Sequence, residues 1–106
     1  MPNKFNKEWT DVELTAAIDA YLEMLSCEQN GKLFNKAEIN RELRAPGAPL
    51  EGRTKASIEY RMQNISAVLM VEKKTVVKGY APAANVGDHI RTRITRILKE
   101  RQKSAD

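Results

Sequence analysis

Apolar residues in the middle of the chain recur at helical spacing, and this spacing restricts what the chain can fold into. The intervals are four, three and four residues, for Ile58, Met62, Ile65 and Leu69. Residues at these intervals stack on one face of a helix. Thr54 precedes the segment and can cap its first turn. The pattern predicts a helix that packs one narrow apolar face against a small core and presents polar side chains elsewhere.

The N-terminal part of the chain predicts two more helices. Thr10 and Glu13 form a capping box, and a broad apolar face follows from Val12 to about Cys27. Trp9, directly before the cap, is expected to anchor the core. A shorter helix is expected to begin after Asn35 and to run to about Arg44, where a segment rich in proline and glycine ends it.

A fourth helix is predicted near the end of the chain. Asp88 can cap it, and its apolar stripe consists of Ile90, Ile94, Ile97 and Leu98. The predicted fold is therefore mainly all-α, a three-helix helix-turn-helix-like core with a further basic helix. The chain is expected to form a single domain over residues 1–106. Within it, the core covers residues 8–70, a connecting arm covers 71–87 and the last helix covers 88–103. Residues 72–82 are expected to form either a short β-hairpin, like the wing of a winged helix, or an extended arm.

Length and composition limit the class of protein. A chain of 106 residues makes one domain with a single core. The single cysteine, Cys27, cannot form an intramolecular disulfide, which favours a reducing compartment. No apolar run approaches the roughly 20 residues of a membrane span. We therefore expect a cytoplasmic protein that does not insert into a membrane.

Charge is unevenly distributed along the sequence. Residues 1–34 carry three basic and six acidic residues, whereas residues 35–106 carry fifteen basic and eight acidic ones. The two parts have net charges of −3 and +7, and the chain as a whole has +4. This asymmetry predicts a basic face that meets a polyanion, with the acidic first helix turned away from it.

The predicted third helix offers side chains suited to double-stranded DNA. Asparagine and glutamine can read adenine, so Tyr60, Gln63 and Asn64 are the candidate base contacts. Arg53, Lys55 and Arg61 are the expected phosphate contacts that position the helix. Further phosphate candidates are Lys73 and Lys74 on the arm, and Arg91, Arg93 and Arg96 on the last helix.

Two short patterns resemble known families. The run Trp-Thr-Asp-Val-Glu-Leu at 9–14, followed by Gly-Arg-Thr at 52–54 before an amphipathic helix, resembles the Myb/SANT-type DNA-binding domain over about residues 8–70. The segments 52–60, 64–69, 78–82 and 85–87 are similar to an N-terminal domain that precedes HNH nuclease modules in bacterial restriction-type endonucleases. This second resemblance implies a targeting or accessory domain that works with a nuclease domain or subunit.

Catalysis is not expected within these residues. An HNH site needs several histidines with Asn or Asp around a metal, whereas this chain has His89 and Cys27 alone. His89 is expected to be an ordinary first-turn residue of the last helix, and Cys27 a partly buried residue. The sequence therefore predicts no catalytic residue, no bound metal and no cofactor.

Two alternatives to DNA binding remain open at this point. The third helix could dock on a partner protein or on a second copy of the chain, because Tyr60 and Arg61 are residue types favoured at interfaces. Ala67 and Val68 could extend an apolar patch there. The chain could also be an enzyme whose site follows no recognised pattern.

Overall fold

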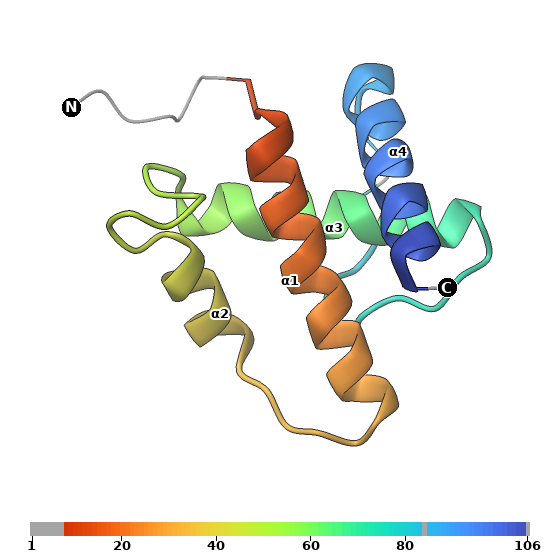
Figure 1. Cartoon of the computed structure of the whole chain (residues 1–106), viewed down its shortest axis with the longest axis horizontal. Helices are drawn as coiled ribbons and strands as arrows, with labels where there is room; N and C mark the ends of the chain where they lie inside the picture. The colour runs from red at the N-terminus through yellow and green to blue at the C-terminus, as the bar shows by residue number, and fades with distance from the viewer. Residues whose placement is uncertain (1–7, 84, 106) are drawn as a thin grey trace.

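A computed structural model describes residues 8–83 and 85–105 of the chain. These residues fold into four helices (Figure 1). The helices are α1 (Asp11–Gln29), α2 (Lys36–Leu43), α3 (Lys55–Val71) and α4 (Asp88–Ala105). The described residues contain no strand, so residues 72–82 form an arm and not a β-hairpin. Within the described part of the chain, no helix is both long enough and apolar enough to cross a lipid bilayer.

The starts of the first three helices confirm the expected caps. Thr10 accepts a hydrogen bond from the Glu13 amide at 3.1 Å, and Glu13 accepts one from the Thr10 amide at 2.9 Å, so the capping box is complete. Asn35 caps α2 and Thr54 caps α3, each through its side-chain oxygen. Helix α4 begins at Asp88 itself, so Asp88 is the first residue of the helix and not the cap that the sequence predicts.

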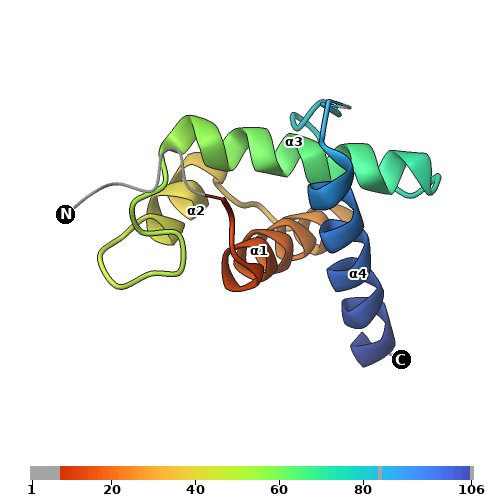
Figure 2. The same cartoon turned by 90° about the horizontal axis from the view of Figure 1, so that it is seen from above.

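Helix α3 is the central element of the core, since it contacts each of the other three helices. Figures 1 and 2 show α1 crossing α3, with α4 beside α1 and α2 near the first turns of α3. The four predicted apolar residues of α3 are all buried, and so is Trp9. Val12 does not follow the predicted apolar face of α1, because its side chain is 71% exposed.

The arm between α3 and α4 contributes to the core. Val77 and Tyr80 are buried, and the Tyr21 and Tyr80 rings stack with centroids 6.2 Å apart. The Val77 amide donates to the Tyr21 hydroxyl at 2.9 Å, and the Tyr21 and Ser66 hydroxyls are 2.7 Å apart. These contacts hold the arm against α1 and α3.

Candidate nucleic-acid interface

The arm covers the face of α3 that the sequence assigned to base contacts. Asn64 is fully buried, and its Nδ2 donates to the Ala83 carbonyl at 3.0 Å. The Ala83 amide donates in turn to the Gln63 carbonyl at 3.1 Å. The prediction that Asn64 faces outward is therefore wrong. The physical reason is that the polar backbone of the arm needs hydrogen-bond partners where it packs on the helix, and the Asn64 amide provides one.

The other two base-contact candidates remain at the surface to different degrees. Gln63 is half-buried, in a hollow between α2 and α3. Tyr60 is 42% exposed, and its hydroxyl donates to the Asn85 carbonyl at 2.8 Å. The arm thus occupies the hydrogen-bonding groups of Tyr60 and Asn64, which leaves α3 without a continuous row of available polar side chains.

Arg53 lies inside the protein, where it cannot reach a phosphate. Its Nε and Nη2 donate to the two carboxylate oxygens of Glu13, both at 2.9 Å, and the two side chains are 2% and 4% exposed. The guanidinium also lies over the Trp9 ring, 4.8 Å from its centroid. The expected position of Arg53 on an outer face is therefore wrong, because its charge is neutralised within the core.

Arg61 is half-buried and has no carboxylate partner in the described structure. Its guanidinium lies 4.9 Å from the centroid of the Trp9 ring, and its Nη1 donates to Asn64 Oδ1 at 2.9 Å. Its Nε is buried without a hydrogen-bond partner. Burial lowers the pKa of Arg61, and the nearby charges of Arg53 and Arg93 lower it further. Arg61 therefore stacks in a cationic cluster and does not extend into solvent.

The three lysine candidates are exposed. Lys55, in the first turn of α3, lies 3.9 Å from Glu59, and Lys74 lies 3.7 Å from Glu72. Lys73 follows α3 with a left-handed backbone at φ 59°. Lys55 lies at the start of α3, whereas Lys73 and Lys74 follow its end, so the three lysines do not form one patch.

Three arginines of α4 pair with acidic residues of α1. Arg93 contacts Asp11 at 2.6 Å, Arg96 contacts the other oxygen of Asp11 at 2.9 Å, and Arg101 contacts Asp19 at 2.6 Å. Hydrogen bonds from Arg93 and then Arg96 hold the pKa of Asp11 below its ordinary value. The expectation that the acidic first helix turns away from the basic surface is therefore wrong. Much of the charge asymmetry is neutralised between α1 and α4.

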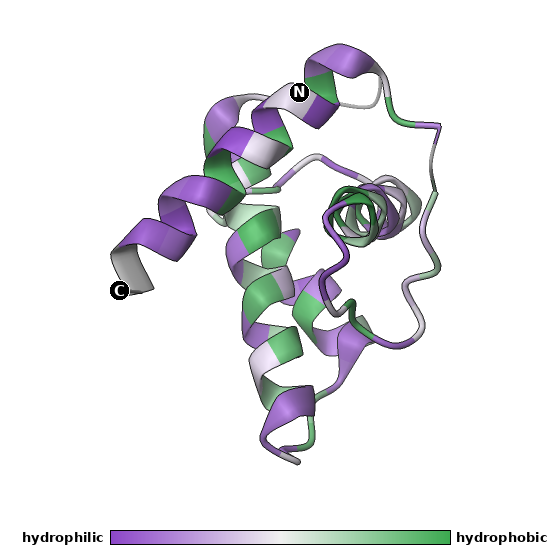
Figure 3. Ribbon diagram, turned by 90° about the vertical axis from the view of Figure 1, so that its right-hand side faces the viewer, coloured by the Kyte–Doolittle hydropathy of each residue, from purple (hydrophilic) through white to green (hydrophobic). Residues whose placement is uncertain are grey.

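The outward side of α4 remains strongly cationic. It carries four basic residues and one acidic residue, namely Arg91, Arg96, Lys99, Lys103 and Glu100. Lys99 and Lys103, exposed and one turn apart, have no carboxylate partner among the described residues. Figure 3 shows the second half of α4 as mainly hydrophilic. The sequence predicts that both lysines belong to the basic surface of the last helix, but its individual phosphate candidates there were Arg91, Arg93 and Arg96.

No arrangement for metal binding is found among the described side chains. His89 lies in the first turn of α4, as expected, and its Nε2 is 2.7 Å from a Glu8 carboxylate oxygen. Cys27 is partly buried, also as expected. Neither residue belongs to a cluster of metal ligands.

Comparisons with known protein families, with curated proteins and with solved structures find no match to this chain. Its function is therefore inferred from the chemistry of its own side chains.

Proposed function

We propose that this domain binds double-stranded DNA through the phosphate backbone, with the outward side of α4 as the main contact. The observation that carries the proposal is the row of cations on that side, in which Lys99 and Lys103 have no carboxylate partner among the described residues. Lysine and arginine side chains that neutralise phosphates release condensed counterions, and this release supplies most of the affinity for DNA that does not depend on sequence.

The length of this face suits a nucleic-acid backbone. Arg91 and Lys103 are twelve residues apart, which corresponds to about 18 Å along a helix. Each DNA strand carries one negative charge per about 3.4 Å of the duplex axis. A straight cationic helix of this length can therefore meet several phosphates without deforming the duplex.

In this proposal the helix-turn-helix-like arrangement of α1, α2 and α3 supports α4 and does not read bases. The arm occupies Asn64, and Arg53 is paired with Glu13. A module that holds DNA by its backbone suits the accessory role that the resemblance implies, in which a nuclease domain or subunit of a restriction system chooses and cuts the site. We expect no cleavage by the domain alone when Mg²⁺ or Mn²⁺ is added.

The proposal is tested by fluorescence anisotropy with a labelled duplex at several salt concentrations. We expect log affinity to fall linearly with log salt, with a slope of about −3 for roughly three neutralised phosphates. The variant Lys99→Glu/Lys103→Glu should bind at least about 10-fold more weakly. Two duplexes of unrelated sequence should bind with affinities within about threefold of each other.

The matched control is Lys32→Glu/Arg41→Glu, which changes the net charge by the same amount. Lys32 lies before α2 and Arg41 on α2, both exposed and away from α4. This control should retain most of the affinity. Equal loss in both variants, or a salt-independent affinity, would contradict binding through α4.

A further inference from the structure

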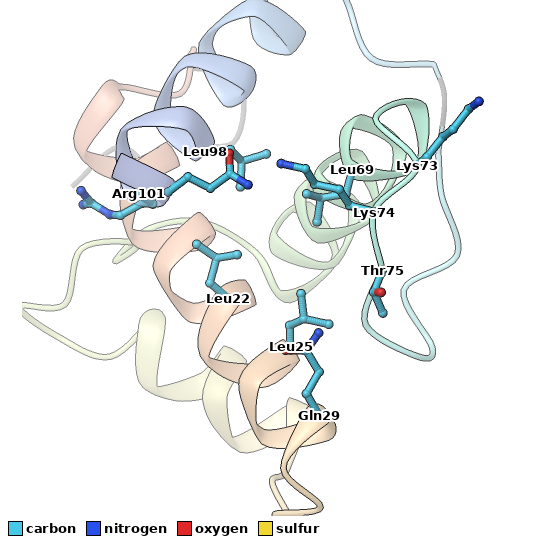
Figure 4. A pocket seen from close by; sticks show the side chains of 10 residues that line it. Leu22, Leu25, Gln29, Leu69, Lys73, Lys74, Thr75, Leu98 and Arg101 are labelled. Carbon is cyan, nitrogen blue, oxygen red and sulfur yellow. The ribbon is translucent and has the colours of Figure 1, made fainter. Parts of the chain in front are cut away.

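A groove of about 480 Å³ lies between the second half of α1, the end of α3 and the second half of α4 (Figure 4). Four leucines form its floor and walls, namely Leu22, Leu25, Leu69 and Leu98. Its other lining residues are polar or basic and come from α1, from α4 and from the start of the arm that follows α3. The groove lies beside the outward side of α4, but none of its lining residues belongs to that side.

The charge of the lining is of one sign. Lys73, Lys74 and Arg101 line the groove, and no acidic residue does. Lys74 points across the groove toward α4, whereas Lys73 points outward (Figure 4). Arg101 pairs with Asp19 and Lys74 with Glu72, and neither of these acidic residues lines the groove. Lys73 has no ion pair among the described residues. An occupant should therefore combine apolar groups with negative charge.

We propose that this groove binds an acidic amphipathic helix of a partner protein. Leucine-type side chains of that helix would enter between Leu25, Leu69 and Leu98. Glutamate or aspartate side chains on the flanks of the helix would meet Lys73 and Lys74. This is the helix-in-groove mode of recognition, in which anchors at positions i, i+4 and i+7 supply the apolar contact.

The dimensions of the groove fit such a helix. Its wall on α1 runs from Leu22 to Gln29, a distance of about 10 Å along the helix axis. Three anchors at positions i, i+4 and i+7 of a bound helix span the same length. Met70 and Val71 are exposed at the same end of α3, by 53% and 77%, and they add apolar surface for the partner.

The openness of the site favours a helix over a small anionic amphiphile such as a fatty acid. Half of the ten lining residues are exposed, among them Gln29, Thr75 and Gln102. Small-molecule sites bury most of their ligand. A helix needs only one buried face, and the rest of its surface can stay in water.

The proposal is tested with a labelled helical peptide of about 18 residues that carries leucines at i, i+4 and i+7 and glutamates on both flanks. Binding is measured by anisotropy in the absence of DNA, so its result is independent of the DNA-binding proposal. We expect saturable binding that shifts the methyl signals of Leu22, Leu25, Leu69 and Leu98 in NMR spectra. A second peptide with lysines in place of the glutamates should bind at least about 10-fold more weakly.

Variants of the rim separate a specific site from general attraction. Lys73→Glu/Lys74→Glu should weaken binding of the acidic peptide at least about 10-fold. The control Arg41→Glu/Lys55→Glu makes the same change in charge on α2 and at the start of α3, and it should bind the peptide like the parent protein. Equal binding of both peptides, or no shift of the leucine methyl signals, would overturn the proposal. Tighter, saturating binding of laurate at the same methyl groups would also overturn it, and so would a dimer that buries the groove.

Discussion

Arg53 and Glu13 form a buried, two-pronged ion pair between residues forty positions apart in the sequence. Both N···O distances are 2.9 Å. The pair connects the start of α1 to the start of α3, because Glu13 also accepts from the Thr10 amide and Arg53 follows the turn that leads into α3. Arg53, which the sequence predicts as a phosphate contact, thus helps to fix the orientation of α1 and α3.

Removing one partner of this pair should destabilise the fold strongly. In Arg53→Met the Glu13 carboxylate remains buried without its counter-charge, so the free energy of unfolding should fall by about 3–5 kcal/mol. Urea denaturation followed by circular dichroism measures this change. The double variant Glu13→Leu/Arg53→Met should be more stable than Arg53→Met alone, since no buried charge is left unpaired. If Arg53→Met were as stable as the parent protein, the ion pair would make no net contribution to the stability of the fold.

Alkaline conditions should destabilise the domain through Tyr80. Burial raises the pKa of Tyr80 to about 12, from an ordinary value of 10.0, so the folded protein holds this proton more tightly than the unfolded chain. The corresponding stability is fully present below pH 10 and is lost as the pH rises toward 12, by on the order of 2 kcal/mol. Urea denaturation from pH 8 to pH 12 would show this decline.

Tyr80→Phe provides the control for that titration. The Tyr80 hydroxyl has no hydrogen-bond partner among the described residues, so the variant should match the parent protein at pH 8. Above pH 10 it should lose less stability than the parent protein. If both proteins lost stability in parallel, the decline would have to come from other groups, such as Tyr21, whose pKa burial also raises.

Local signals in the sequence were sufficient for most of the secondary structure. The hydroxyl or amide caps at Thr10, Asn35 and Thr54 act within three residues, and the apolar stripe of α3 repeats within two turns. These patterns predict a helix without knowledge of its neighbours. The burial of Trp9 followed from the same kind of local reasoning.

The failed site predictions all depended on contacts between distant parts of the chain. Asn64 appeared to be outside because it lies on the flank of the apolar stripe, and only the path of the arm places Ala83 against it. Arg53 and Glu13 gave no local sign of their pairing. Helical periodicity shows which side of a helix is apolar, but it does not show which other segment covers the polar side.

The tie between the arm and α3 can be tested at Asn64. Asn64→Ala leaves the Ala83 carbonyl and the Arg61 guanidinium without their partner, which should cost about 1–3 kcal/mol. Amide hydrogen exchange should increase at Ala83, whose amide donates to the Gln63 carbonyl. Ser57→Ala, on the same helix but away from the arm, is the control and should leave that exchange unchanged. Unchanged protection of the arm in Asn64→Ala would show that other contacts hold it.

The pairing between α1 and α4 predicts that removing one acidic residue strengthens DNA binding. Asp11 pairs with both Arg93 and Arg96. In Asp11→Asn their remaining carboxylate contacts in the described structure are Glu8, 3.8 Å from Arg93, and Glu100, 3.3 Å from Arg96, so both cations should become more available to phosphates. Affinity for a duplex should rise several-fold, and the salt dependence should become steeper by about one unit of slope. Glu23→Gln is the matched control, because it removes the same charge from an exposed position of α1 that has no ion pair among the described residues. If both variants raised the affinity equally, net charge alone would account for the effect. A larger gain in Asp11→Asn would mean that α1 limits how much of the charge on α4 is available to DNA.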